Sequence, residues 1–528
     1  MQAGMGSESQ LEDKVHMEGH IADQGRRILR EHRFPPSWRV AWLAQFCHGF
    51  TVTVDNVMRK QLEADSRYGP AIAEAVVDIK EVGGIMGVVI GSILVQAAGR
   101  IMGLHVYGVG TILGVRPFDA GTLATVLSPQ LPALPALPTW FLICAFQAVS
   151  GVFIAVGNMS AHVYLTEVAP DEDRGAVVGI QHCFYLAGRL VAVVFPHRLP
   201  WQWFAVISLL PYVWLVIVTG LIVESPRWLL QVNRPTDAQR AYEVLGIALS
   251  GDECAILAIR TQRLQTPLRA VVCFIFVYWM RMLGGPMGMQ KYQDLQLVGV
   301  RDTFYGLNDV VMVIFQIAIM PGVIFLADAI GRRFLLYISS MLIAVILPVS
   351  AYLVHRIKLA ETLVENAIYE RAIMCAALCS VVAYSVGLGP VSILVCTEIL
   401  PPRRHGLVAG LLYAVVRTLF FALRWSLRSG SSQVWYFVTT GATAWLSLVV
   451  LMCLLPETKQ MALDKVPNLF SDDPWVRAAA AVASQEAGGT HALALAKATR
   501  QFPLRDFADT YAPAAAQEES DTSSSQPE

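Results

Sequence analysis

The chain has 528 residues with a formal net charge of −1; 55% of them are hydrophobic and 15% are charged. Soluble globular domains carry about 25% charged residues, so this composition excludes an ordinary soluble domain and predicts a membrane protein. The near-zero net charge gives no reason to expect a nucleic-acid partner.

Apolar stretches long enough to cross a bilayer follow one another along the chain. A hydrocarbon core of about 30 Å needs roughly 20 apolar residues per helix. The polar segment 1–37 comes first, and we expect no cleavable signal peptide there. The predicted spans of the first half are 38–58, 79–99, 101–115, 139–163, 177–196 and 203–223. Those of the second half are 270–289, 308–327, 334–354, 372–397, 406–425 and 435–455.

These spans define two six-helix halves, 38–223 and 270–455, joined by the polar linker 224–269. The tail 456–528 ends in polar sequence that indicates disorder. Lysine and arginine are more frequent on the segments that lie inside when both termini are cytoplasmic, which is the orientation that this bias predicts. The sequence therefore predicts an all-α membrane protein with twelve transmembrane helices.

A short charged pattern repeats after the fourth span of each half. It reads Thr166-Glu167-Val168-Ala169-Pro170 with Arg174 in the first half, and Thr397-Glu398-Ile399-Leu400-Pro401 with Arg403 and Arg404 in the second. Two halves repeated in parallel are typical of transporters whose substrate site lies near the bilayer midplane.

The loop after the second span repeats as well, as Gly99-Arg100 and as Asp328-Ala329-Ile330-Gly331-Arg332-Arg333. Carboxylates and arginines at equivalent helix ends predict a cytoplasmic charge clamp that breaks and re-forms as the halves move. We expect Glu167 to pair with Arg174 or with an arginine of a neighbouring helix, and Glu398 with Arg403 or Arg404. The candidate clamp residues are Glu167, Arg174, Asp328, Arg332, Arg333, Glu398, Arg403 and Arg404.

Four short motifs carry a family resemblance over about residues 38–470. They are Tyr164-Leu165-Thr166-Glu167-Val168-Ala169-Pro170, Glu224-Ser225-Pro226-Arg227-Trp228-Leu229-Leu230, Gly387-Leu388-Gly389-Pro390-Val391 and Pro456-Glu457-Thr458-Lys459. In this order they resemble the sugar porter family, the glucose-transporter branch of the major facilitator superfamily. The organic-ion transporters of that superfamily share two of the motifs and are the second resemblance.

The resemblance implies a major facilitator fold that moves a small polar solute across a bilayer by alternating access, with no enzymatic activity and no cofactor. The 9 cysteines are scattered, without the spacing of a metal site. We expect a multi-pass protein of the plasma membrane whose partners are the lipid bilayer and a small-molecule substrate.

Several positions depart from the family pattern. The family's fourth-helix arginine falls on Gln147, and the seventh-helix run whose amides hold sugar hydroxyls reads Arg281-Met282-Leu283-Gly284-Gly285-Pro286-Met287. The same resemblance aligns the fifth-helix glutamine with His182, an acidic residue with Ser385, the tenth-helix tryptophan with Ile393, and the eleventh-helix Asn-Trp pair with Val416-Arg417. Most of the sugar-contacting side chains of the family are therefore replaced.

Charged residues inside membrane helices are rare and normally face a cavity or a partner. Helical spacing places His182, Tyr185 and Arg189 on one face. The resemblance puts the span arginines on cavity-lining faces, and Asp55 where the family has an acidic residue in its first helix, as a candidate proton site. The candidate substrate-binding residues are His182, Tyr185, Arg189, Arg281, Ser385, Ile393 and Arg417. We expect His48 and His162 to be core histidines.

Three functions stay open at this point. The first is a divergent sugar porter for a hexose or polyol. The second is an organic-anion carrier on the same scaffold, because a cationic cavity suits a carboxylate, sulfate or phosphate that arginine binds with two parallel hydrogen bonds. The third is a transport-inactive receptor or regulator.

Overall fold

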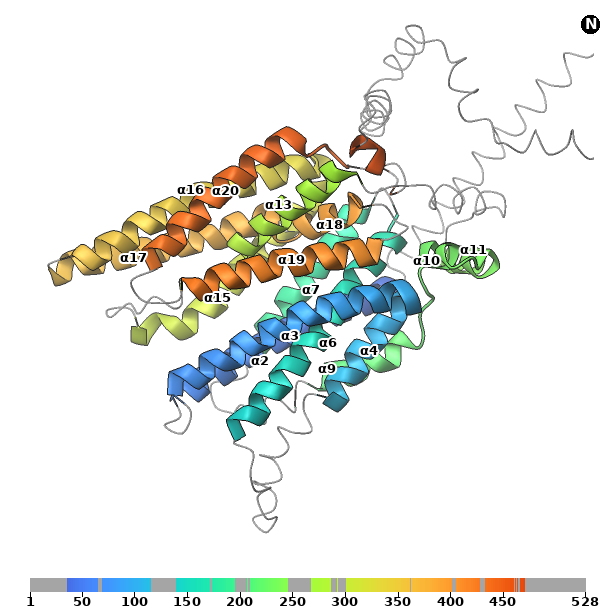
Figure 1. Ribbon diagram of the computed structural model, residues 1–528, viewed down its shortest axis with the longest axis horizontal. Coiled ribbons are helices and arrows are strands. Elements are labelled where there is room, and N and C mark those ends of the chain that lie inside the picture. Colours follow the sequence, from blue (N-terminus) through green and yellow to red (C-terminus); the bar gives the residue numbers. More distant parts are fainter. Residues whose placement is uncertain are drawn as a thin grey trace, which may run out of the picture.

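A computed structural model of the protein describes most of the predicted spans. The described residues are 36–64, 69–114, 139–170, 173–194, 207, 209–245, 267–285, 292, 301–360, 362–400, 405–427, 433–459, 461, 463 and 466–470. Every regular element within these ranges is a helix (Figure 1).

Each predicted span of the first half contains a helix. These helices are α2 (Pro36–Ala64), α3 (Gly69–Ala98), α4 (Arg100–Gly114), α6 (Thr139–Val168), α7 (Arg174–Val194) and α9 (Leu210–Thr219). The predicted start of α3 at residue 79 is wrong, because the helix begins at Gly69. Its first turns carry the charged residues Glu74 and Asp78, so a search for apolar stretches does not count these turns as part of a span. In the structure Asp78 is paired with Arg424 of α19.

The second half has the same organisation, with one interruption. Its helices are α13 (Leu268–Gly284), α15 (Arg301–Ala329), α16 (Arg332–Leu359), α17 (Leu363–Ala383), α18 (Val391–Glu398), α19 (His405–Ser426) and α20 (Gln433–Leu454). The predicted span 372–397 divides into α17, a π-helical turn at Tyr384–Leu388, and α18. Pro390 is the N-cap residue of α18, a position at the start of a helix where proline's missing N–H costs no helical hydrogen bond.

Seven helical segments among the described residues are long and apolar enough to span a bilayer, one of them running through α17, the π-helical turn and α18. They cover Ala71–Ala98, Ile143–Val168, Arg174–Val193, Arg332–Leu359, Val364–Glu398, Gly406–Ser426 and Gln433–Leu454. Large apolar side chains on their outer faces are exposed, as at Met341 and Leu446. A bilayer would cover such a surface, and backbone that is hydrogen-bonded within helices is what a hydrocarbon environment requires.

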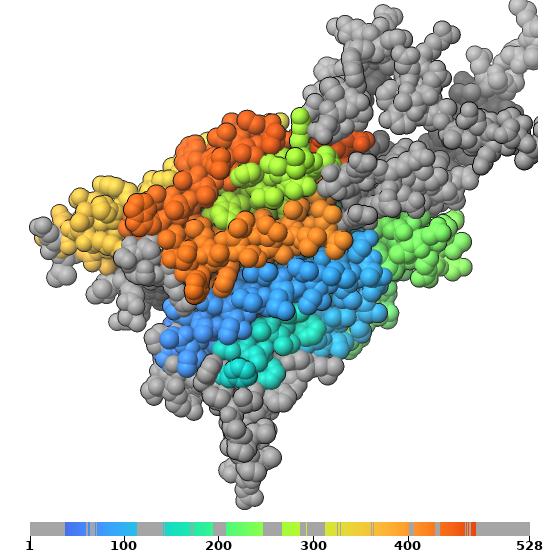
Figure 2. Space-filling model, in the orientation of Figure 1, coloured from blue at the N-terminus to red at the C-terminus, as the bar shows by residue number. Residues whose placement is uncertain are grey.

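The helices of each half pack mainly with one another. In Figure 1 the first half lies along one side of the molecule in blue to green, and the second half lies opposite in yellow-green to red. The halves meet where α3 packs against α19 and where α7 packs against α15. Figure 2 shows the first of these contacts on the surface, with blue α3 directly beside orange α19. The all-α prediction is confirmed.

Glycines hold α3 close to α6. A methyl group at Gly83 or Gly87 would overlap the backbone carbonyl of Ala148 or Val152. Small residues that let helix backbones approach are typical of membrane-helix interfaces. This contact fixes the position of α3, which carries the charged residues of the site described below.

Two short helices, α10 (Pro226–Gln231) and α11 (Pro235–Val244), follow the first half and lie beside one end of the bundle (Figure 1). The Ser225 hydroxyl caps α10 by accepting the N–H of Trp228. The rest of the predicted linker to residue 266 lies outside the described residues. A 3₁₀ turn at Val466–Phe470 ends the described chain.

Candidate functional site

A buried ion pair joins α4 to α6 in the first half, at the end of the bundle where α3 ends and α4 begins. Arg100 donates from Nε and Nη2 to Glu167 at 2.8 and 2.6 Å. Ser225 donates its hydroxyl to the same carboxylate at 2.6 Å. Gly99 turns the chain with φ of 105°, a value that favours glycine, so that the Arg100 N–H reaches Glu224 at 3.1 Å. Burial raises the pKa of the Glu224 carboxyl.

The second half repeats this cluster residue by residue. Arg332 donates from Nη1 to both oxygens of Glu398 at 2.7 and 2.8 Å. Thr458 donates its hydroxyl to Glu398 at 2.8 Å, as Ser225 does in the first cluster. Gly331 has φ of 115°, and the Arg332 N–H reaches Glu457 at 3.0 Å. The repeat in the sequence therefore corresponds to a repeated ion-pair cluster.

One arginine connects the two halves at this end. Arg174 donates from Nη1 to Glu398 at 3.1 Å and to the Met461 carbonyl at 3.0 Å. The side chains of Arg174 and Glu398 have no exposed surface. Beside them the hydroxyls of Thr166 and Thr397 are 2.9 Å apart. We call these contacts, together with the two clusters, the clamp, and this end of the bundle the clamp end.

The clamp agrees with one of the two alternatives predicted for Glu167, an arginine of a neighbouring helix. The described ion-pair partners of Glu398 are Arg332 and Arg174, whereas the predicted Arg403 and Arg404 lie outside the described residues. Glu167 pairs with Arg100 of a neighbouring helix, and Arg174 instead reaches Glu398 across the halves. The pairing depends on which helices adjoin in space, and spacing along the chain does not determine that.

Of the other predicted clamp residues, the structure describes the side chain of Arg333 alone. Arg333 lies on α16, where its N–H donates to Glu457 and its guanidinium to the Tyr337 hydroxyl and the Met452 carbonyl. Arg403, Arg404 and the side chain of Asp328 lie outside the described part of the chain. Their predicted roles stay predictions.

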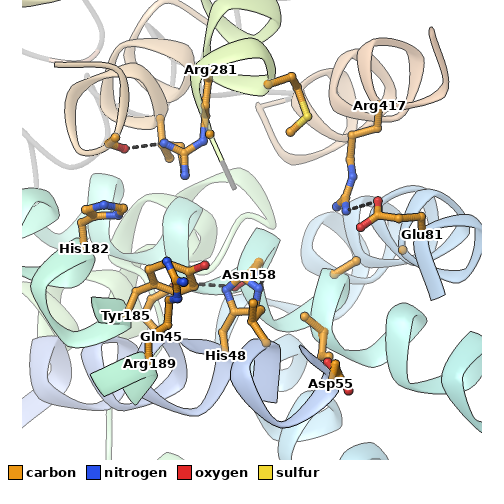
Figure 3. Close-up of a pocket in the computed structure, with 18 of the residues that line it drawn as sticks. Gln45, His48, Asp55, Glu81, Asn158, His182, Tyr185, Arg189, Arg281 and Arg417 are labelled. Atoms are coloured by element: carbon orange, nitrogen blue, oxygen red, sulfur yellow. Dashed lines mark hydrogen bonds and ion pairs between the residues drawn. The ribbon is translucent and has the colours of Figure 1, made fainter. Parts of the chain in front are cut away.

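A cavity of about 320 Å³ lies between the halves, and helices of both halves line it (Figure 3). Figure 3 shows Arg281 and Arg417 on the second-half side and His48, Tyr185 and Arg189 on the first-half side. Small-molecule sites have volumes of about 300–1,000 Å³, so the cavity has the size of a site for one small ligand.

Six of the seven predicted substrate-binding residues line this cavity: His182, Tyr185, Arg189, Arg281, Ile393 and Arg417. Ser385 is the exception. It is fully buried within the second half and donates its hydroxyl to the Val381 carbonyl of its own helix at 2.7 Å. The geometry does not support a substrate contact for Ser385.

Arg281 turns toward the interrupted helix. Its Nη1 donates to the carbonyls of Leu388 and Gly389 and, at 3.2 Å, to the Ser392 hydroxyl. These two carbonyls lie at the junction of the π-helical turn and α18, and the Leu388 carbonyl also accepts the Ser392 hydroxyl at 2.5 Å. Its guanidinium carbon also lies 5.8 Å from the Tyr384 ring centre. All three of these hydrogen bonds start from Nη1, and Arg281 lines the cavity. Its contact with an anion therefore stays a prediction.

Arg417 is also paired. Its Nη2 lies 3.0 Å from Glu81 on α3, a carboxylate that the sequence analysis did not assign to the site. Asp55, which we proposed as a proton site, is paired with Lys80 and accepts a weak hydrogen bond from Gln147 at 3.5 Å. The sequence did not indicate the two partners, Lys80 and Glu81, because they lie next to the predicted helix boundary at residue 79.

Part of the first-half wall of the cavity is a network of neutral polar side chains. Gln45 donates to Asn158 at 2.9 Å, and Asn158 contacts His48 at 3.4 Å. Gln181 contacts His162 at 2.8 Å. His48 and His162 line the cavity, so the expectation that they are core histidines is wrong. They lie on α2 and α6, and only the packing of those helices shows that they face one space.

Several buried polar atoms of the cavity wall have no hydrogen-bond partner among the described residues. They are His48 Nδ1, Gln147 Oε1, Gln181 Oε1, His182 Nε2, Arg189 Nε, Gln316 Oε1 and Tyr413 Oη. Buried polar groups are normally satisfied, so a convergent set of this kind points to a ligand-binding site. The set contains both donors and acceptors.

Comparison with known proteins agrees with the fold. The model of the family described as "Sugar (and other) transporter" matches residues 40–470. A mouse facilitated glucose transporter, member 8 of solute carrier family 2, is 23% identical over 80% of this chain and 91% of its own length. The trehalose transporter Tret1 of the honeybee Apis mellifera ligustica is 24% identical over 73% of this chain and 81% of its own.

Solved structures show the same architecture. The proton:xylose symporter XylE bound to 6-bromo-6-deoxy-D-glucose superposes with a TM-score of 0.66 at 16% identity, covering 83% of this chain and 98% of that one. The partially occluded inward-open form of XylE from E. coli gives 0.60 at 15% identity, with 80% and 98% covered. The fold is thus the major facilitator fold of multi-pass membrane transporters. The chain belongs to the sugar transporter family.

Proposed function

We propose that the protein carries a polyhydroxylated solute of about monosaccharide size, a hexose or polyol or a close derivative, through the cavity by alternating access. The observation that supports this most is the convergent set of unpartnered donors and acceptors on the cavity wall. A sugar hydroxyl both donates and accepts, so it matches a wall of imidazole, amide and phenol groups. The named substrates of the relatives are consistent with this class of ligand.

Three of the four cations that line the cavity already contact protein groups, which favours this proposal over a simple organic-anion carrier. Arg417 and Lys80 have carboxylate partners, and Arg281 donates from Nη1 to two carbonyl oxygens and one hydroxyl oxygen. Two of the three arginines that suggested an anion are therefore occupied by the protein itself.

Alternating access requires contacts that hold the halves together on one side at a time. We propose that the clamp is the contact that closes the clamp end, with Arg174 as the bond that must break for that end to open. We further propose that the clamp end faces the cytoplasm of a plasma-membrane protein with both termini inside. Epitope tags near residue 5, near residue 250 and near residue 520 should then bind antibody only after permeabilisation. Binding to the tag near 250 in intact cells would contradict this topology.

The binding site predicts the effect of two substitutions. Gln181→Ala and His182→Ala each remove one hydrogen-bonding group from the cavity, so each should weaken sugar or polyol binding by about three- to tenfold. Isothermal titration of the purified full-length protein with hexoses and polyols measures this.

Ser385→Ala is the matched control, because its hydroxyl bonds only within its own helix. It should leave the affinity unchanged. Equal affinities in the wild type and in both cavity variants would exclude this wall as the binding surface.

A further inference from the structure

The cavity wall holds more positive than negative charge. Its lining residues include four cations, Lys80, Arg189, Arg281 and Arg417, and two carboxylates, Asp55 and Glu81. With neutral histidines the lining therefore has a surplus of two positive charges. Charge at membrane depth is energetically unfavourable unless it is paired or solvated, so each of these cations needs a partner.

Three of the four cations have a protein partner. Lys80 pairs with Asp55, Arg417 pairs with Glu81, and Arg281 donates to backbone carbonyls. The carbonyl oxygens do not neutralise the charge of Arg281, but they take the place of water around its guanidinium.

Arg189 is the exception. No ion pair or hydrogen bond connects its side chain to any residue that the structure describes, and its Nε is buried without an acceptor. Its helix packs closely on α2, where a methyl group at Gly49 would contact the Arg189 backbone N at 3.2 Å. Arg189 lines the cavity on the same side as His48 and Tyr185 (Figure 3).

We propose that the transported solute carries a carboxylate in addition to its hydroxyl groups, as uronic and aldonic sugar acids do, and that Arg189 binds this carboxylate. The inference rests on the proposed function, because the hydroxyl groups use the polar wall described above. A guanidinium presents two parallel N–H donors that match the two oxygens of a carboxylate. An arginine inside a membrane span without a protein partner is the feature expected of a substrate site.

A neutral sugar accounts for the histidines and glutamines of the wall but gives Arg189 no counter-charge. A simple inorganic anion gives Arg189 a partner but leaves the unpartnered atoms of Gln181 and His182 unused. A sugar acid satisfies both groups at once. Binding should therefore need the hydroxyls and the carboxylate together.

The test compares sugars that differ only in one acidic group. We would titrate the purified full-length protein with glucose against glucuronate, galactose against galacturonate, and sorbitol against gluconate, with acetate and sulfate as anions without the sugar. The acidic member of at least one pair should bind more than tenfold more tightly than its neutral partner, and acetate and sulfate should bind weakly. Arg189→Gln should remove this preference while the neutral sugar binds within about threefold of the wild-type value. Arg189→Lys should keep part of it, because the charge remains and the paired donors are lost.

Arg356→Gln is the matched control. Arg356 contacts Tyr369 at the far end of α16 and is not part of the cavity wall. It should leave the preference intact.

Each outcome decides between the two proposals. If acidic and neutral members bind equally, or if Arg189→Gln keeps the preference, the inference is wrong while the proposed function stands. If neither class binds, the proposed function fails as well. If acetate or sulfate binds as tightly as the sugar acids, the site is a simple anion site. Should Arg189→Gln not fold, the wild-type preference and Arg189→Lys decide the question.

Discussion

Replacing Arg417 by glutamine should reduce transport more than tenfold, and replacing Glu81 by glutamine should have a similar effect. Each change leaves the partner charge unpaired in the cavity wall at the contact between α3 and α19, where the side chains of Arg417 and Glu81 are 17% and 20% exposed. Removing one member of a largely buried pair is more damaging than removing both. The double variant should therefore recover much of the lost activity.

A double-mutant cycle measures this coupling. Initial transport rates and thermal stability of the wild type, both single variants and the double variant should give a coupling free energy of about 1–3 kcal/mol. Arg356→Gln serves as the charge control and should leave the rate unchanged. Additive losses in the double variant would contradict the pairing.

Replacing Arg174 by glutamine should shift the conformational equilibrium toward the state that is open at the clamp end, by about ten- to a hundredfold. The Arg174 guanidinium, in the first half, binds the Glu398 carboxylate of the second half at this end. A charge-assisted hydrogen bond contributes about 1.5–3 kcal/mol, which corresponds to this factor. Spin labels at Arg240 of α11 and Ile330 of the second half should report a larger population of long distances.

Arg100→Gln is the comparison for this variant. Arg100 binds Glu167 and the Val95 carbonyl, both within the first half. Its loss should lower thermal stability without a matching gain in the open population. An equal opening in both variants would mean that Arg174 has no special role between the halves.

Local sequence patterns predicted the fold well. Apolar length fixes a membrane helix, and the repeated Glu167 and Glu398 motifs marked equivalent helix ends. Both features are local, and they gave the all-α class and the region of the clamp. The start of α3 was missed because a paired aspartate at position 78 makes a membrane helix look polar.

The site was harder to predict because its contacts join distant parts of the chain. Arg281 sits among apolar neighbours in sequence, and nothing near it indicates that a π-helical turn a hundred residues later supplies its acceptors. Glu81 and Arg417 are separated by most of the chain, yet they touch. His48 and His162 resemble core residues until α2 and α6 are placed around one cavity.

The central claim is that this cavity carries a polyhydroxylated solute across the membrane. The most direct test is counterflow uptake into proteoliposomes that contain the full-length protein, with labelled hexoses, polyols and sugar acids supplied outside. We expect saturable uptake of at least one of these solutes, loss of that uptake in Arg417→Gln, and wild-type uptake in Ser385→Ala. Absence of saturable uptake for every solute, by protein that is folded and correctly inserted, would contradict the account.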